Sequence, residues 1–258
     1  MIEMGSWEST RGDAGGTDPI GGSLGSRVAV VTGASRGIGA AIARALGREG
    51  AFIVGAARTR ADLEVALAGL PAALAVPTDV SDPQAVRTLF EAAAQVRGRV
   101  DIVVNAAGVL RRAPVEQTTL ADWRESLEVN LTAVFLCSRA AVRQMLGQRE
   151  APGGVRGHIV QIVSGAGVHG WEGSSAYAAS KFGVMGFTET LREEVRGRGI
   201  KVTEILPGMV DTDMTAQPEF SGRAKLAPED VARAVLAAVT ASPAAVLQRV
   251  DVRHLAPR

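Results

Sequence analysis

The chain of 258 residues is poor in reactive side chains, with one cysteine, Cys137, and one tyrosine, Tyr177. A single cysteine excludes an intrachain disulfide and any metal cluster built from several thiolates. Cys137 follows the apolar residues Val134, Phe135 and Leu136, which predicts a packed thiol rather than a reactive one. Any chemistry must therefore come from other polar residues.

Aromatic residues are also scarce, at 4% of the chain, and the formal net charge is only +1. Both values argue against a nucleic-acid partner, and the low charge argues against an anionic membrane partner. No apolar run approaches the roughly 18 residues that a membrane-spanning helix needs. The N-terminus lacks the apolar segment of a secretory signal. These absences predict a globular protein of the reducing cytoplasm.

The first 25 residues are rich in glycine, serine, threonine and aspartate and show no periodicity. We interpret residues 1–25 as a flexible leader outside the fold, followed by one domain over residues 26–258. Within that domain, short apolar runs predict seven strands, at 28–31, 52–56, 73–76, 100–104, 158–163, 200–206 and 245–252. Between them, helices are predicted at 40–48, around 63–67, and at 83–96, 121–146, 175–196 and after Pro228.

This alternation predicts an α/β fold, a single doubly wound Rossmann domain with a mostly parallel seven-stranded sheet and helices on both faces. Ligands bind such sheets at the carboxyl ends of the strands. The one long irregular stretch, 209–226, is a candidate lid over that site.

Gly33, Gly37 and Gly39 lie between the first predicted strand and the helix that follows it. Glycines at such a turn let the backbone approach a pyrophosphate, and the helix N-terminus offers free N–H groups and partial positive charge. A plain glycine-rich turn is the alternative interpretation. The position after the first strand of a repeating pattern favours dinucleotide binding.

The end of the second predicted strand selects between the two nicotinamide cofactors. NAD binding favours an acidic residue there, to hold the ribose 2′-hydroxyl, but this chain has Arg58 and no carboxylate until Asp62. Arg58, and Arg36 in the glycine turn, can each reach a 2′-phosphate. Both could instead be solvated surface arginines. We predict that NADP(H) is preferred over NAD(H).

Tyr177 and Lys181 are four residues apart in a predicted helix, so their side chains share one face. A nearby ammonium favours tyrosinate and lowers the tyrosine pKa. A chance surface pair is the alternative. Ser164 and Asn105 each end a predicted strand, at the edge where a ligand is expected. Asn130 interrupts an apolar helix, either as a satisfied core amide or as a holder of water.

Together these residues resemble the classical short-chain dehydrogenase/reductase family, over nearly the whole chain after the leader. The segments that carry the resemblance are Thr32–Gly39, Asp79–Val80, Asn105–Gly108, Asn130, Ser164, Tyr177 with Lys181, and Pro207–Gly208 with Thr212 beyond.

The resemblance implies a catalytic set. Tyr177 is the general acid in reduction and the base in oxidation, and Ser164 supports the substrate oxygen. Lys181 holds the nicotinamide ribose and lowers the tyrosine pKa, and Asn130 positions a water in a proton relay. The implied cofactor-binding residues are Gly33, Ser35, Arg36, Gly37, Ile38, Gly39, Arg58, Asp79, Val80, Asn105, Ala106, Gly108, Tyr177, Lys181, Pro207, Gly208, Val210 and Thr212. No metal is required.

The implied reaction interconverts a carbonyl and a secondary alcohol, and the substrate stays open between a 3-oxoacyl thioester, a small hydroxy acid and another ketone. The C-terminal tail favours the hydroxy-acid group, whereas residues 206–215 resemble the acyl-reductase group. The expected pocket wall is Gly165, Ala166, His169, Trp171, Met209 and Met214. The resemblance also implies a homo-dimer or homo-tetramer, assembled through helices 121–146 and 175–196.

Three other protein classes share part of this pattern. An epimerase would share the tyrosine–lysine pair but usually carries a larger C-terminal substrate domain. A methyltransferase would want an acidic residue after the second strand and has no use for the pair. A non-catalytic dinucleotide sensor is the strongest alternative, although such a protein should have broken catalytic positions.

Overall fold

The computed structural model describes residues 23–151 and 153–255. Seven strands form one sheet in the order β3-β2-β1-β4-β5-β6-β7, and every neighbouring pair is parallel. The strands are β1 (Val28–Thr32), β2 (Phe52–Ala57), β3 (Ala73–Pro77), β4 (Ile102–Asn105), β5 (Gly157–Ile162), β6 (Ile200–Pro207) and β7 (Arg249–Val252). The predicted doubly wound α/β fold is confirmed.

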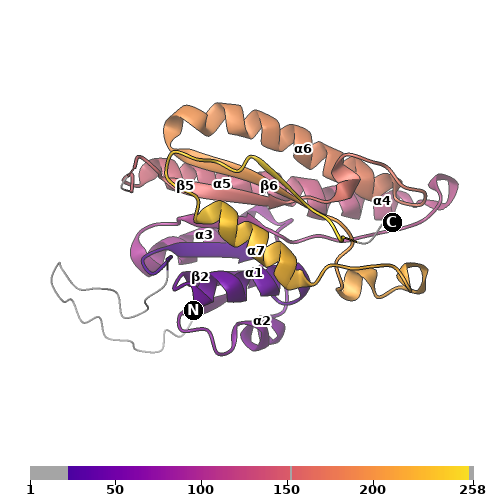
Figure 1. The fold of residues 1–258 in the computed structure, drawn as a ribbon, viewed down its shortest axis with the longest axis horizontal. Coiled ribbons are helices and arrows are strands. Elements are labelled where there is room, and N and C mark those ends of the chain that lie inside the picture. The colour runs from indigo at the N-terminus through magenta and orange to yellow at the C-terminus, as the bar shows by residue number, and fades with distance from the viewer. Residues whose placement is uncertain (1–22, 152, 256–258) are drawn as a thin grey trace.

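Helices cover both faces of the sheet because alternate strand residues point to opposite sides. The helices are α1 (Gly37–Arg48), α2 (Arg60–Leu67), α3 (Pro83–Arg97), α4 (Leu120–Leu127), α5 (Ala133–Gly147), α6 (Ser175–Val195) and α7 (Pro228–Val239). In β1, Ala29 and Val31 join the core beneath α1, α2 and α7, whereas Val28 and Val30 join the core beneath α3, α5 and α6. In Figure 1, α7 lies alongside α1.

The strand order reverses direction between β1 and β4. Thr32, the last residue of β1, pairs with Ala56 of β2 on one side and with Asn105 of β4 on the other. Crossovers leave β1 and β4 for opposite faces of the sheet, so a crevice opens outside the carboxyl ends of these two strands. The fold therefore brings the glycine turn and the end of β4 to the place where a ligand is expected.

The predicted helix 121–146 is wrong in one respect, because it is interrupted. A π-helical turn, Glu128–Thr132, separates α4 from α5 and has the buried Asn130 at its centre. Single π-turns are rare and occur often at functional sites. The apolar periodicity of the sequence continues on both sides of the π-turn, so it does not reveal the one additional residue that the π-turn contains.

Two predicted strands are too long at their N-terminal ends. The fourth begins at Ile102 rather than at 100, and the seventh begins at Arg249 rather than at 245. Before β7, the Nζ of Lys201 donates hydrogen bonds to the carbonyl oxygens of Ser242 (2.6 Å) and Ala245 (2.7 Å). A side chain there satisfies backbone groups that a longer strand would have paired.

The predicted leader also reaches too far into the chain. Leu24 is buried in the core, and its N–H donates to the carbonyl of Glu49 (2.9 Å). The Ser23 hydroxyl donates to the Glu49 carboxylate (2.9 Å). A lone leucine in a polar segment gives no periodic signal, although it packs against the end of α1. The rest of the predicted leader, residues 1–22, lies outside the described residues.

Candidate active site

The glycine turn between β1 and α1 requires glycine at several positions. Gly33 and Gly37 have φ angles of 66° and 54°, in the left-handed region that favours glycine. A Cβ on Gly33 would lie 2.9 Å from the backbone N and Cα of Ala107, and one on Gly39 would lie 2.2 Å from the Gly33 carbonyl oxygen. The turn is therefore packed directly against the loop after β4.

The N-terminus of α1 lacks the side chains that usually neutralise a helix start. Its N-cap residue, Arg36, makes no side-chain cap hydrogen bond, and the first turn contains no acidic residue. Free N–H groups and a partial positive charge suit the phosphates of a dinucleotide. With the glycine cradle, this donor set fits the nicotinamide dinucleotide that the sequence predicts.

Thr32 joins this turn to the loop after β4. Its Oγ1 accepts hydrogen bonds from the N–H groups of Ala106 (3.1 Å) and Ala107 (3.2 Å). The predicted site residues omit Thr32, although its position as the last residue of β1 would have placed it here. One buried hydroxyl thus fixes the backbone that carries two predicted cofactor-binding residues, Ala106 and Gly108.

Asn105 lies beneath that loop in a buried polar cluster. Its Nδ2 donates to Ser138 Oγ (3.2 Å) and to Gln161 Oε1 (2.9 Å), and Gln161 Nε2 donates to the same Ser138 Oγ (2.9 Å). All three side chains are buried. The cluster ties the end of β4 to α5 and β5, so the side chain of Asn105 supports the loop from within the protein.

Tyr177, Ser164 and Lys181 meet where β5 ends and α6 begins. The Ser164 side chain hydrogen-bonds with the Tyr177 hydroxyl and accepts from the N–H of Ala166 (3.1 Å). Lys181 Nζ donates to the carbonyl of Ile162 (3.1 Å) and lies 5.7 Å from the centre of the Tyr177 ring. The structure therefore brings together three of the four predicted catalytic residues.

Burial dominates the electrostatics of this triad. It lowers the pKa of Lys181 to about 8, since the charged ammonium loses solvation. Burial also raises the pKa of Tyr177, and the hydrogen bond with Ser164 acts in the opposite direction. This corrects the expected lowering of the Tyr177 pKa, because in the chain alone desolvation of the phenolate outweighs the hydrogen bond with Ser164.

Asn130, the fourth predicted catalytic residue, connects the loop after β4 to α6 by hydrogen bonds. Its Oδ1 accepts from the N–H of Val109 (2.8 Å), and its Nδ2 donates to the Val109 carbonyl (2.9 Å) and to Ser180 Oγ (3.1 Å). The Ser180 hydroxyl in turn donates to the carbonyl of Tyr177 (2.7 Å). The π-turn thus positions the start of α6 through Ser180, which the predicted set omits.

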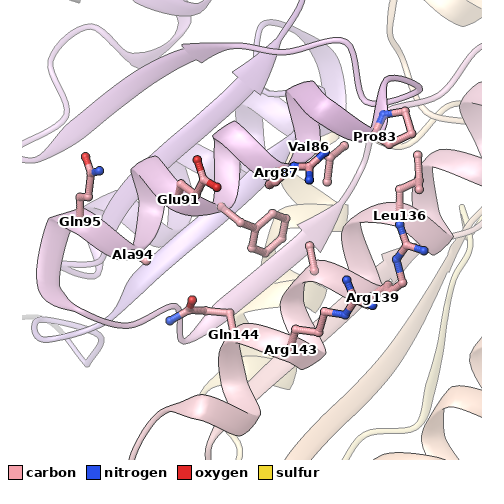
Figure 2. Close-up of a pocket in the computed structure, with 12 residues that line it drawn as sticks. Pro83, Val86, Arg87, Glu91, Ala94, Gln95, Leu136, Arg139, Arg143 and Gln144 are labelled. Atoms are coloured by element: carbon pink, nitrogen blue, oxygen red, sulfur yellow. The ribbon is translucent and has the colours of Figure 1, made fainter.

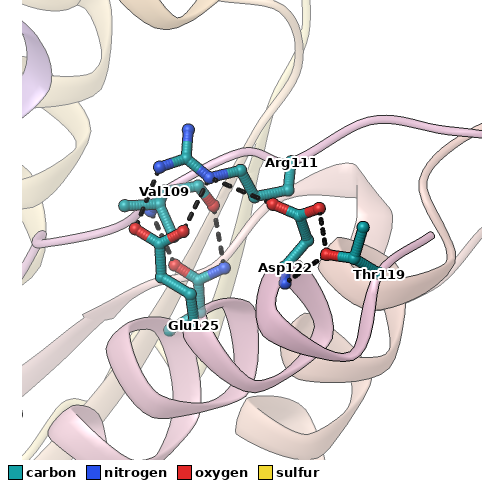
Figure 3. A network of polar contacts seen from close by, with 6 residues as sticks. Val109, Arg111, Thr119, Asp122 and Glu125 are labelled. Atoms are coloured by element: carbon teal, nitrogen blue, oxygen red, sulfur yellow. Dashed lines mark hydrogen bonds and ion pairs between the residues drawn. The ribbon is translucent and has the colours of Figure 1, made fainter.

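Arg111 holds the loop after β4 on its other side. Its guanidinium donates to both carboxylate oxygens of Glu125 in α4, at 2.7 and 2.9 Å (Figure 3). Asp122, one turn earlier, accepts from the hydroxyl of Thr119 (2.5 Å). The loop is therefore anchored to α4 as well as to the π-turn.

The two arginines of the cofactor prediction differ in their surroundings. Arg58 is exposed after β2, close enough to Asp79 to help lower the pKa of that carboxyl, which the hydrogen bonds from Ser81 lower more strongly. Arg36 forms an exposed ion pair with Asp213 (3.4 Å). Val80, beside Asp79, is buried.

The segment after β6 folds over the glycine turn. The Cγ2 of Thr212 lies 3.1 Å from the position of a Cβ on Gly37. The N–H of Gly208, which follows Pro207, donates to Val252 (2.8 Å), and the buried Val210 bridges to Leu226. These contacts bring the four predicted cofactor residues of this segment, Pro207, Gly208, Val210 and Thr212, to the same edge of the sheet as the glycine turn.

The candidate lid, 209–226, is more ordered than the sequence suggested. It contains two 3₁₀ turns, Asp213–Thr215 and Pro218–Phe220. Arg112, from the loop after β4, pairs with Glu219 (3.1 Å), covers the ring of Phe220 (5.1 Å) and donates to the Glu172 carbonyl (2.9 Å). One arginine thus links three loops.

The residues expected to line the substrate pocket are divided between the interior and the surface. Gly165 and Ala166 are buried, Met209 and Met214 are half-buried, and His169 and Trp171 are exposed.

A separate groove of about 580 Å³ lies between α3 and α5 (Figure 2). None of the predicted site residues lines that groove, so it is distinct from the site at the strand ends.

Within residues 23–151 and 153–255, no three histidine, cysteine or acidic side chains gather in a way that could hold a metal ion. In the same ranges, no helix has the length and hydropathy to cross a membrane.

Cys137 is buried, and desolvation raises the pKa of its thiol to about 12, so the packed thiol is confirmed.

Known proteins resemble this chain in sequence. An uncharacterized oxidoreductase of Staphylococcus aureus (strain USA300) is 38% identical over 219 residues, which cover 84% of this chain and 92% of the relative. A 3-oxoacyl-[acyl-carrier-protein] reductase of Synechocystis is 40% identical over 197 residues, which cover 74% of this chain and 77% of the relative.

Solved structures resemble it in fold. A dehydrogenase/reductase from Sinorhizobium meliloti superposes with a TM-score of 0.81 at 30% identity, covering 91% of this chain and 96% of the other. A metagenomic short-chain oxidoreductase, solved in complex with NADP, superposes with a TM-score of 0.77 at 35% identity, covering 90% and 98%. The family model for short chain dehydrogenases matches residues 27–220. This chain is therefore a member of the short-chain dehydrogenase family of oxidoreductases.

Proposed function

We propose that the protein is an NADP(H)-dependent oxidoreductase that interconverts a carbonyl and a secondary alcohol, with Tyr177 as the general acid and base. The observation that carries this proposal is the meeting of Tyr177, Ser164 and Lys181 at the carboxyl end of β5. The bound nicotinamide would supply or accept the hydride, which leaves the protein to bind the substrate and move the proton.

Each polar group of the site has a defined task in reduction. Ser164 holds the carbonyl oxygen by a hydrogen bond, and Tyr177 gives that oxygen its proton as negative charge develops. The raised pKa of Tyr177 keeps the proton on the hydroxyl at neutral pH, as an acid requires. Lys181, which is mostly charged at that pH, stabilises the tyrosinate left behind.

Asn130 has two roles in this proposal. Its amide positions α6, and it holds a water through which the proton is replaced. Both N–H groups of the amide are engaged by Val109 and Ser180. The water would therefore bind a carbonyl oxygen of Asn130, on the main chain or on the side chain.

The preference for NADP(H) rests on Arg58, which is exposed where an acidic residue would favour NAD. The NADP complex of the metagenomic relative supports the same choice. The similarity to a 3-oxoacyl-[acyl-carrier-protein] reductase supports a 3-oxoacyl thioester as one substrate class, beside a small hydroxy acid and other ketones. We also propose a cytoplasmic homo-dimer or homo-tetramer.

A substrate screen tests the proposal. Consumption of NADPH at neutral pH is followed with a panel of 3-oxoacyl thioesters, oxo acids and simple ketones, beside a reaction without carbonyl. We expect at least one carbonyl to accelerate NADPH consumption. A protein that binds NADPH but consumes it at the same rate with and without every carbonyl would instead be a dinucleotide sensor.

A further inference from the structure

Gly165 follows Ser164 directly, and the side chains of Arg253 and Trp171 occupy the space beside it. A Cβ placed on Gly165 would lie 2.5 Å from Nη1 of Arg253 and 3.1 Å from Cη2 of Trp171. The position is buried, although Trp171 is exposed. A guanidinium group thus lies against the residue that follows Ser164.

Arg253 reaches this place from the edge strand of the sheet, β7, which lies beside β6. It follows β7, whose Val252 carbonyl accepts the N–H of Gly208 (2.8 Å). A Cβ on Gly208 would lie 3.7 Å from Cδ of Arg253. The side chain therefore passes over the end of β6 toward the end of β5, which is next to β6 in the sheet.

Arg253 shares its nearest carboxylate with a second arginine. Its Nη2 donates to Oδ1 of Asp251 (2.8 Å), and the other oxygen of Asp251 lies 3.4 Å from Nε of Arg249. One carboxylate is thus shared by two guanidinium groups. Nη1 of Arg253 makes no hydrogen bond to another group in the part of the chain that the structure describes, and the side chain is 33% exposed.

We propose that Arg253 binds a carboxylate of the substrate, so that the carbonyl compound is a short oxo acid. The proposal rests on the function proposed above and selects among its substrate classes. A guanidinium matches a carboxylate with two parallel hydrogen bonds. Ser164 and Gly165 are neighbours, about 3.8 Å apart at Cα, so the acid places its carboxylate only a few bonds from the carbonyl. Trp171 covers the apolar part of such a molecule.

A matched pair of substrates tests this role. Acetoacetate and methyl acetoacetate carry the same ketone, but only the first carries a charge. We expect a higher kcat/KM for acetoacetate in the unmodified protein. Arg253→Met, which keeps an unbranched apolar side chain but removes the guanidinium, should raise the KM for acetoacetate at least about tenfold and leave the KM for the ester unchanged. Arg249→Met, on the other side of Asp251, should change neither.

The outcomes separate this proposal from the general one. Turnover of the ester with no preference for the acid, or equal losses on both substrates in Arg253→Met, overturns the carboxylate role and leaves the carbonyl reductase standing. A binding measurement covers the case in which neither compound is reduced. Calorimetric titration of 3-hydroxybutyrate into the protein with NADPH, a pair that cannot react, should show binding that Arg253→Met weakens at least about tenfold. Absent or unaltered binding overturns the proposal.

Discussion

In the proposed function, single residues decide the cofactor preference and the proton chemistry of the site. Arg58 replaces the acidic residue that would hold a ribose 2′-hydroxyl, and it stands exposed beside Asp79. Lys181 is buried beside Tyr177, and this burial lowers its pKa to about 8. Both features are properties of one side chain in one place, so each can be tested by one substitution or one titration.

Arg58→Ala should raise the KM for NADPH about tenfold or more, because a charge-assisted contact with the 2′-phosphate is lost. The KM for NADH should hardly change. Steady-state kinetics with both cofactors measure the effect, and Arg60→Ala is the matched control, since Arg60 is exposed and pairs with Glu64 (3.7 Å). An unchanged NADPH constant in Arg58→Ala would refute the role of this arginine.

The pH profile of reduction should fall as pH rises through about 8, because Lys181 then loses the charge that stabilises the tyrosinate. The pKa of Lys181 is about 8 in the folded chain and 10.5 for an ordinary, solvated lysine, which we take for the unfolded chain. Between these two pH values, Lys181 is therefore mostly charged in the unfolded chain and mostly neutral in the folded chain. Burial of Lys181 therefore costs stability below pH 8, and this cost disappears above 10.5. A rate that stays level from pH 6 to 10 would contradict the assignment.

At the scale of elements, the π-turn between α4 and α5 positions α6, the helix that carries Tyr177 and Lys181. Asn130 at its centre contacts the loop after β4 directly and reaches α6 through Ser180. Tyr177 stands in the first turn of α6, so a displacement of this turn moves the phenol relative to Ser164. The π-turn therefore aligns α6 with the loop after β4.

Ser180→Ala should lower kcat while the KM for NADPH stays close to its normal value. It should also destabilise the fold by about 1–3 kcal/mol, because a buried N–H of Asn130 loses its acceptor. Denaturant unfolding and steady-state kinetics measure the two effects. Thr190→Ala, which removes an exposed hydroxyl bond on the same helix, is the control. Equal behaviour of the two variants would show that Ser180 does not position α6.

Periodic elements of this fold follow from sequence, whereas isolated features do not. Alternating apolar runs predict the strands because both faces of a parallel sheet are buried. Leu24 and the π-turn at Asn130 carry no periodic signal, since one residue decides each. Arg253 was not predicted as a site residue because its place beside Gly165 depends on contacts between β5, β6 and the tail, which only the folded chain brings together.

At the scale of the whole molecule, three helices in contact with one another carry large exposed apolar residues. They are Leu120 and Trp123 in α4, Phe135 in α5 and Phe182 in α6. Phe135 packs edge-on against Phe187 of α6, which makes the surface continuous between these helices. Such a surface is typical of a subunit interface, and it lies on the helices through which the sequence predicts assembly.

Light scattering should therefore give a mass of at least twice the 26.7 kDa of one chain. Phe182→Glu should shift that mass toward a single chain, because a buried charge disfavours the interface. Val65→Glu, at an exposed position of α2 on the other face of the sheet, should leave it unchanged. A monomeric mass for the unmodified protein would contradict the assembly.

The most direct test of the central claim compares Tyr177→Phe with the unmodified protein in the NADPH assay, using the best carbonyl of the screen. Loss of one hydroxyl should lower kcat by at least about 100-fold, because the proton donor is gone. NADPH binding, followed by fluorescence, should stay the same within about twofold. If Tyr177→Phe consumes NADPH as fast as the unmodified protein, Tyr177 is not the acid and base of this site.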